Sequence, residues 1–302
     1  MRARSVLFGA VLLAGALPAQ PTTAELTPLT TFRLDTRLVV LNVSVLGPDG
    51  NIVKGIPESA FSVFEDGQKQ EIKVFRQEDV PISLGLIVDN SESMGSKRER
   101  VISAVRALME ASNHDDEVFV VNFNENPKLV QDFTSNVSLL EASLRKIDAA
   151  GETAMRDALR EGLEHLRVKG RKDKKVLLVV TDGEDNASVE AQQHLVQVAY
   201  QSNVIIYAIG LLGGEQPQSA ERARKSLEEL TLATGGRAWF PADVAEITQI
   251  TPEIAHEIRN QYVVGYEPAN QANDGAFRKI RVEVNVPDVH VRTRSGYYAP
   301  VQ

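Results

Sequence analysis

The chain has 302 residues, which is long enough for one sizeable domain and a smaller one. Apolar residues make up 43% of the sequence and charged residues 25%, ordinary proportions for a protein that buries a core. The net charge of -8 is spread over both halves without a basic tail, so nothing indicates binding to nucleic acid or to an anionic membrane. The absence of cysteine excludes disulfides, thiolate metal sites and a cysteine nucleophile.

The N-terminal residues 1–19 predict an export signal. Two arginines precede an apolar stretch, which ends at the small residue Ala19, and we expect cleavage after it. The alternative is an N-terminal membrane anchor, but the apolar stretch is too short to span a bilayer comfortably. Residues 20–35 have no periodicity and predict a flexible lead-in. We therefore expect a mature protein without a membrane span, in the periplasm or secreted.

Two stretches of β pattern flank the middle of the chain. Residues 36–79 alternate polar and apolar side chains between turn signals, which predicts three or four strands, with 61–64 forming a hairpin with 72–75. Residues 261–300 return to the same pattern. Each stretch has too few strands to bury a good core alone, so we expect the two to pack together as one small β module.

Residues 81–259 alternate apolar strands with amphipathic helices. This alternation predicts an α/β domain with a doubly wound, mostly parallel, Rossmann-like sheet. A weaker strand at 129–133 is expected at an edge of the sheet, and a helix is expected from about 189 to 201. The strongest buried strands are predicted at 82–88, 118–123, 176–180 and 204–209.

A polar triplet follows the first buried strand of this domain: Asp89, Ser91 and Ser93. Ligands bind at the carboxyl ends of strands in open α/β sheets, where loops are free of packing constraints. One carboxylate and two hydroxyls are hard oxygen donors, the kind that magnesium and manganese prefer. The same residue types also form polar turns and helix N-caps, so the triplet alone leaves both interpretations open.

Two more oxygen donors lie on loops expected at the same edge of the sheet. Thr153 stands at a predicted helix start, and Asp182 follows the strand at 176–180. Each alone would be explained as an N-cap or a turn. Together with the triplet, however, this pattern over 81–259 resembles the von Willebrand factor type A domain. In that family, the metal-ion-dependent adhesion site uses an Asp-x-Ser-x-Ser motif, a distant Thr and a distant Asp.

The resemblance implies a role for each of the five residues. Ser91, Ser93 and Thr153 would approach a Mg²⁺ or Mn²⁺ ion through their hydroxyls, while Asp89 and Asp182 would act directly or through water. Such a shell leaves one position for an acidic side chain of a protein partner, as in adhesion. The sequence departs from the family at Glu152, where a glycine is more common, and this side chain would crowd or repel the incoming ligand.

The flanking segments carry a second resemblance. The segments Phe-Ser-Val-Phe-Glu-Asp-Gly at 61–67 and Tyr-Val-Val-Gly-Tyr at 262–266 are similar to the exported bacterial proteins of the VWFA-related acidobacterial domain family. The similarity extends over about 36–300. It supplies no biochemical role.

The sequence lacks the residue patterns that are typical of an enzyme. The five histidines have no metal-ligand spacing, and the sequence has no nucleophile elbow, dinucleotide fingerprint or P-loop. An aspartyl phosphatase would need a second aspartate where Ser91 stands. We therefore expect a non-catalytic interaction module. A metal-dependent hydrolase and a structural envelope or scaffold protein stay open as alternatives.

Overall fold

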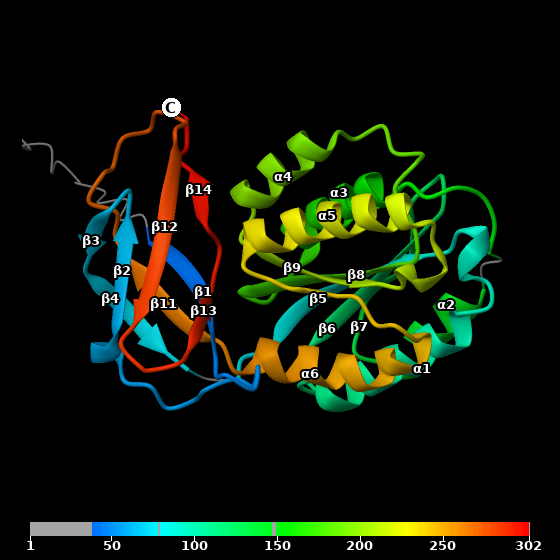
Figure 1. Cartoon of the computed structure of the whole chain (residues 1–302), viewed down its shortest axis with the longest axis horizontal. Coiled ribbons are helices and arrows are strands. Elements are labelled where there is room, and N and C mark those ends of the chain that lie inside the picture. The colour runs from blue at the N-terminus through cyan, green and yellow to red at the C-terminus, as the bar shows by residue number, and fades with distance from the viewer. Residues whose placement is uncertain (1–37, 78, 147–148, 302) are drawn as a thin grey trace, which may run out of the picture. The chain divides into compact units, whose positions relative to one another are not determined.

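A six-stranded sheet between two layers of helices forms the central part of the fold (Figure 1). The computed structural model describes residues 38–77, 79–146 and 149–301, so the predicted export signal and lead-in lie outside the described residues. The strand order is β10-β9-β8-β5-β6-β7, and all neighbours are parallel except β6 and β7, which are antiparallel. The strands are β5 (Ile82–Asp89), β6 (Glu117–Phe123), β7 (Lys128–Thr134), β8 (Lys174–Thr181), β9 (Val204–Gly210) and β10 (Ala238–Trp239).

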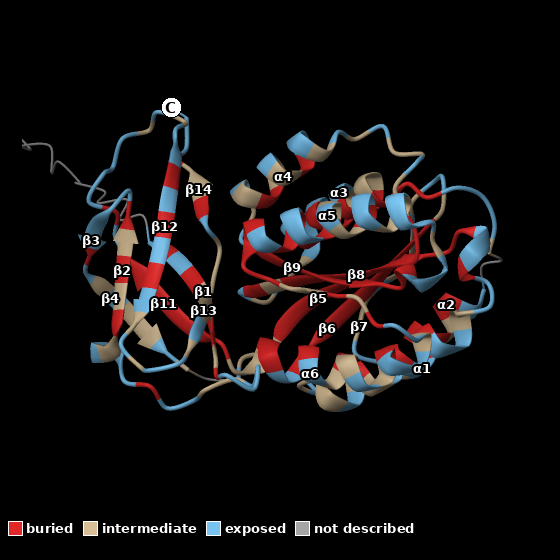
Figure 2. Ribbon diagram, in the orientation of Figure 1, coloured by how far each residue is buried: buried red, intermediate tan, exposed pale blue. Residues whose placement is uncertain are grey.

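Both faces of this sheet are covered, which explains why its inner strands are continuous apolar runs rather than alternating ones (Figure 2). The first face packs against α1 (Arg98–Ala111), α2 (Val137–Arg145) and α6 (Ile247–Arg259). The second face packs against α3 (Met155–Lys169), α4 (Gln192–Gln201) and α5 (Pro217–Thr234). The predicted α/β class with a mostly parallel sheet is confirmed.

Two four-stranded sheets form a separate β module. Their orders are β13-β1-β11-β4 and β14-β12-β2-β3, so strands from both ends of the described chain take part in each sheet. Their facing apolar side chains, among them Leu41, Val63, Val264 and Ile280, form a third core. The strands are β1 (Val39–Leu46), β2 (Phe61–Glu65), β3 (Gln68–Gln70), β4 (Ile72–Arg76), β11 (Tyr262–Tyr266), β12 (Phe277–Val284), β13 (His290–Arg292) and β14 (Gly296–Tyr298).

The hairpin turn expected after 61–64 is present, but the expectation that 72–75 is its second strand is wrong. Strand β2 instead pairs with β3, which follows directly after a two-residue turn at Asp66 and Gly67 with φ of 49° and 82°. Strand β4 crosses to the other sheet and pairs with β11. This crossing places Phe75 in the core, with ring centroids 4.9 Å from Phe61 and 5.7 Å from Tyr262. Strand β4 therefore completes the sheet of β11 and does not extend the hairpin.

A buried polar cluster joins the β module to the α/β domain. Glu257, near the end of α6, accepts hydrogen bonds from Ser44 Oγ on β1 at 3.2 Å and from Tyr207 OH on β9 at 3.0 Å. It also pairs with Arg292 on β13. Gln261 donates to the Ser44 and Tyr207 hydroxyls at 3.0 and 3.2 Å. Residues Arg37–Gln302 accordingly form one compact unit.

Helix α4 starts later than its sequence pattern indicates. The remaining short elements are 3₁₀ turns. Helix α4 begins at Gln192, not near 189, because the backbone N–H groups of Val189 and Glu190 donate to the Asp157 carboxylate at 3.0 and 2.8 Å. No helix in the described part of the chain is long and apolar enough to cross a bilayer. The 3₁₀ turns are η1 (Glu58–Ala60), η2 (Glu92–Met94), η3 (Leu212–Gly214) and η4 (Val244–Glu246).

Candidate metal centre

The five predicted metal-binding residues lie on three loops at the carboxyl edge of the six-stranded sheet. Asp89 is the last residue of β5, and Ser91 and Ser93 follow it around the turn η2. Asp182 comes directly after β8, the neighbour of β5 in the sheet. Thr153 lies two residues before α3. Parallel pairing of β5 and β8 thus brings two of the loops side by side.

The Asp89 carboxylate is held in a fixed orientation below the loop surface. Its Oδ1 accepts the backbone N–H of Ser91 at 2.8 Å, and its Oδ2 accepts the Thr181 hydroxyl at 2.6 Å. Only 2% of Asp89 is exposed, and this burial raises its pKa, although the hydrogen bonds oppose the rise. The nearby Asp182 carboxylate raises it further. A cation between the two carboxylates would therefore relieve an electrostatic cost.

The serine hydroxyls connect the first loop to Asp182. Ser91 Oγ lies 3.2 Å from Ser93 Oγ, and Ser93 Oγ donates to Asp182 Oδ1 at 2.9 Å. Ser91 and Asp182 are buried, with 3% and 2% of their surface exposed, whereas Ser93 is exposed to solvent. The hydrogen-bonded group thus reaches from the buried edge of the sheet to the surface.

Thr153 lies on the adjoining loop and is buried, with 6% exposed. Its N–H donates to Asn186 Oδ1 at 2.9 Å, and its carbonyl accepts the Asn186 N–H at 3.0 Å. Two residues before Thr153, the Gly151 carbonyl accepts the Glu92 N–H at 3.4 Å, and this hydrogen bond connects the loop to the triplet at 89–93. Among the described residues, no hydrogen bond joins the Thr153 hydroxyl to the other four side chains. Glu152 is exposed.

Lys97 belongs to this site, and the sequence analysis missed it. Its Nζ forms an ion pair with Asp182 Oδ2, and 23% of the Lys97 side chain is exposed against 1% of Asp182. Lys97 lies four residues after Ser93, in the turn before α1. Closeness to Ser93 in the sequence is the one signal that could have placed Lys97 in the site. No local pattern at Lys97 indicates that Asp182 is its partner. One of the two carboxylates thus already has an internal counter-charge.

Thr181 and Asn186 are two further supporting residues that the sequence analysis missed. Thr181 holds Asp89, and Asn186 holds the backbone of Thr153. Both lie in the polar stretch that begins at the end of β8, a position typical of ligand-binding loops.

The donor set of the five residues fits a hard divalent cation. Two carboxylates and three hydroxyls are all oxygen donors, which suit magnesium or manganese rather than zinc or copper. Residues 38–77, 79–146 and 149–301 contain no cluster of three or more His, Cys, Asp or Glu side chains placed to hold a metal. A metal here would therefore depend on the serine and threonine hydroxyls.

Comparisons with known proteins bear on the fold that carries these residues. Residues 84–184, which include all five candidate ligands, match the family model of the von Willebrand factor type A domain. A solved von Willebrand factor type A structure from Catenulispora acidiphila is 12% identical and aligns over 89% of this chain and 75% of that one, with a TM-score of 0.51. No curated protein matches the sequence.

A pilus protein has a related fold. The D319A mutant of the PilB minor pilin from Streptococcus sanguinis is 12% identical and aligns over 59% of this chain, with a TM-score of 0.50. The alignment spans 61% of that chain, so about three fifths of the pilin is represented here. At this identity the likeness concerns the fold. Residues 84–184 thus match the von Willebrand factor type A domain, and the α/β part that contains them has the fold of such a domain.

Proposed function

We propose that this chain is an exported, non-catalytic interaction module that binds Mg²⁺ or Mn²⁺ and uses the ion to hold an acidic side chain of a protein partner. Asp89, Ser91, Ser93, Thr153 and Asp182 would supply the oxygen donors. The observation that carries the proposal is a pair of buried carboxylates on neighbouring loops: Asp182 accepts a hydrogen bond from the exposed Ser93 hydroxyl, and Asp89 accepts one from the Ser91 backbone N–H. Von Willebrand factor type A domains are generally interaction modules, which supports the same function.

The charge of the site favours an acidic ligand. Only two of the five donors are anionic, and Lys97 contributes a further positive charge beside Asp182. A bound divalent ion would therefore keep residual attraction for an outside carboxylate. The exposed position of Ser93 supports access from solvent. Glu92 and Glu152 are exposed and adjacent in sequence to candidate metal ligands, and their carboxylates would repel such a ligand.

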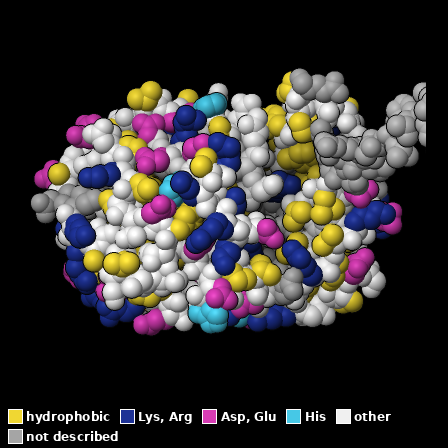
Figure 3. Space-filling model, turned by 180° about the vertical axis from the view of Figure 1, so that it is seen from behind, with side chains coloured by type: hydrophobic (Ala, Val, Ile, Leu, Met, Phe, Trp, Pro, Cys, Tyr) yellow, Lys and Arg dark blue, Asp and Glu magenta, His cyan; other side chains and the backbone are white. Residues whose placement is uncertain are grey.

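The surroundings of the site favour binding over catalysis. No histidine in the described part of the chain hydrogen-bonds to any of the five residues; His165 and His194, for example, pair with Asp132 and Glu190. No histidine of the described residues is therefore placed beside the five donors to act as a general base. Lysine and arginine are interspersed with acidic side chains on the face drawn in Figure 3, which gives no continuous basic surface for nucleic acid on that face.

Calorimetric titration with MgCl₂ and MnCl₂ tests the proposal. We expect one bound ion per chain and an affinity at least about tenfold weaker in Asp182→Asn, because the variant loses one of the two carboxylates. Asp288→Asn is the matched control, since Asp288 is exposed and has a φ of 54° that asparagine also adopts. Equal affinity in Asp182→Asn and wild type would contradict the metal site.

Capture of exported proteins from the same organism tests the partner. We expect capture by the wild-type chain to be lost with a chelator and restored by Mg²⁺. Capture that is unaffected by chelation would contradict metal-dependent recognition even if the metal binds. Fractionation that finds an intact Met1 terminus in the cytosol would contradict export.

A further inference from the structure

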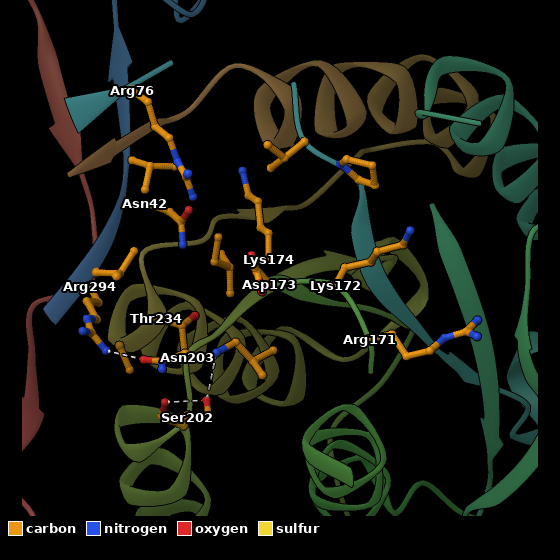
Figure 4. Close-up of a pocket in the computed structure, with 18 residues that line it drawn as sticks. Asn42, Arg76, Arg171, Lys172, Asp173, Lys174, Ser202, Asn203, Thr234 and Arg294 are labelled. Atoms are coloured by element: carbon orange, nitrogen blue, oxygen red, sulfur yellow. Dashed lines mark hydrogen bonds between the residues drawn. The ribbon is translucent and has the colours of Figure 1, made fainter. Parts of the chain in front are cut away.

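A second cleft lies at the opposite, amino edge of the six-stranded sheet. It has a volume of about 520 Å³ and opens between the sheet β13-β1-β11-β4 and the α/β domain. Its lining includes Asn42 on β1, Lys174 at the start of β8, and Arg294 between β13 and β14. Figure 4 shows these side chains, with Arg76 and Asn203, around one common space. The cleft is therefore separate from the loops that carry the candidate metal ligands.

Arg294 is a cation in this cleft without an acidic partner. Its Nη1 donates to Asn203 Oδ1 at 3.1 Å, while its Nε is enclosed and has no hydrogen-bond partner among the described residues. The guanidinium lies 5.6 Å from the centre of the Tyr297 ring. No carboxylate in the described ranges forms an ion pair with it. A desolvated cation in this state is costly unless an anion approaches, and its burial accordingly lowers the pKa of Arg294.

Lys174 is a second buried cation that lines the same space. It is 8% exposed, and its Nζ donates to the Ile258 carbonyl in the last turn of α6. No carboxylate among the described residues lies within ion-pair distance of Lys174. Burial lowers its pKa to about 7, although the more distant charges of Glu257, Asp79 and Asp116 oppose this. Lys174 has further N–H groups available besides the one that bonds to Ile258.

The rest of the lining is partly apolar and partly amide. Val40, Val204, Ile205 and Val263 contribute aliphatic surface. The Asn42 amide has no hydrogen-bond partner within the described ranges, and it points into the cleft in Figure 4. Asp173 is exposed and is the only carboxylate among the described lining residues. A ligand that fits must offer both an anionic group and an apolar group.

We propose that this cleft binds an amphipathic carboxylate, a molecule in which one carboxylate is attached to an apolar chain. The carboxylate accepts a charge-assisted hydrogen bond from the Arg294 guanidinium, and the Lys174 ammonium adds positive charge to the same cleft. The apolar chain covers the aliphatic wall formed by the valines and Ile205. The inference rests on this cleft alone and does not depend on the metal site.

Displacement of 8-anilinonaphthalene-1-sulfonate by decanoate, followed by fluorescence on the full chain, measures this binding. We expect decanoate to bind about tenfold more weakly to Arg294→Gln and to Lys174→Met, because the first variant loses a charge-assisted bond and the second loses a positive charge of the cleft. Arg281→Gln is the matched control, since Arg281 is exposed on β12 and lies outside the cleft lining. Circular dichroism melts show whether each variant folds. Unchanged decanoate affinity in both cleft variants would overturn the proposal.

Competitors that lack either the carboxylate or the apolar chain test the contribution of each group to binding. Decanoate should displace the dye more effectively than decanol, which lacks the charge, and more effectively than acetate, which lacks the chain. Equal displacement by decanol or by acetate would overturn the proposal. Comparison of decanoate with N-acetyl-leucyl-leucine tells whether a fatty acid or a peptide terminus is the better source. A chelator should leave all these affinities unchanged, and a loss on chelation would place the dye at the metal loops and overturn the assignment.

Discussion

The two edges of the six-stranded sheet carry opposite chemistry. At the carboxyl edge, buried aspartates face the starts of helices, and Asp185 accepts the backbone N–H of Arg156 in the first turn of α3 at 2.7 Å. At the amino edge, three basic side chains donate to carbonyls in the last turns of α6, α3 and α1: Lys174 to Ile258, Lys175 to Leu166, and Arg259 to Ala111.

The direction of the helices explains this difference. A helix that follows a parallel strand begins at the carboxyl edge of the sheet and ends at the amino edge; α2, which follows the antiparallel strand β7, runs the other way. The unpaired N–H groups and the positive helix ends therefore favour acidic groups at the first edge, and the unpaired carbonyls favour basic groups at the second. The difference between the two edges shows that one sheet topology can favour a cation site at its carboxyl edge and an anion site at its amino edge. The four predictions below test it, from the largest expected effect to the smallest.

The strongest effect is expected at Glu257, near the amino edge. Glu257→Ala removes the acceptor for Ser44 and Tyr207 and leaves Arg292 without its carboxylate. We expect the free energy of unfolding to fall by about 3 to 5 kcal/mol, because a buried charge loses its partner. Urea denaturation measures this change. A loss below about 1 kcal/mol would mean that the cluster does not hold the two parts together.

At the carboxyl edge, Asp89→Asn should affect metal binding far more than stability. Asparagine is close in shape but supplies no charge, so we expect Mg²⁺ affinity to fall about a hundredfold, or about 2.7 kcal/mol. Stability should change by only about 1 kcal/mol, since a desolvated carboxylate is removed together with part of its hydrogen bonding. Calorimetry and urea denaturation on the same samples separate the two effects. A large loss of stability with unchanged metal affinity would contradict the role of Asp89 as a metal ligand and indicate a structural role instead.

Lys174→Met should stabilise the protein in a pH-dependent way. The folded-state pKa of about 7 lies below the ordinary value of 10.5, so folding releases a proton between these pH values. The wild-type protein therefore gains stability from this group as pH rises from 7 towards 10.5. We expect the variant to be about 2 kcal/mol more stable at pH 6, with the advantage shrinking towards pH 10.

Urea denaturation at several pH values, with Lys225→Met as the control, measures this difference. Lys225 is exposed on α5, so its replacement should give a pH-independent and small change. A constant difference between Lys174→Met and wild type from pH 6 to pH 10 would contradict a buried lysine with a lowered pKa.

The smallest effect is expected at Lys97, which competes with a metal for Asp182. Lys97→Met removes the internal counter-charge, so we expect Mg²⁺ to bind about tenfold more tightly, or about 1.4 kcal/mol. The metal-free variant should be about 1 kcal/mol less stable, because Asp182 is then buried without a cation. Calorimetry and thermal melts in the presence of a chelator measure the two quantities. Weaker metal binding in Lys97→Met would show that the ammonium assists the ion instead.

The sequence by itself determined the α/β class and the loops on which Asp89, Ser91, Ser93, Thr153 and Asp182 lie. These features depend on local patterns: a continuous apolar run identifies a buried strand, and a polar residue directly after it must lie at the edge of the sheet. That these residues bind a metal stays a prediction.

Only the tertiary structure decided which distant residues meet. The ion pair of Lys97 with Asp182 depends on the pairing of β5 with β8. The pairing of β4 with β11 also joins segments far apart in the sequence, and local strand patterns do not indicate such a partner. The cleft lined by Lys174 and Arg294 is formed by packing between the β module and the α/β domain, and no local pattern near either residue indicates that the two line the same cleft.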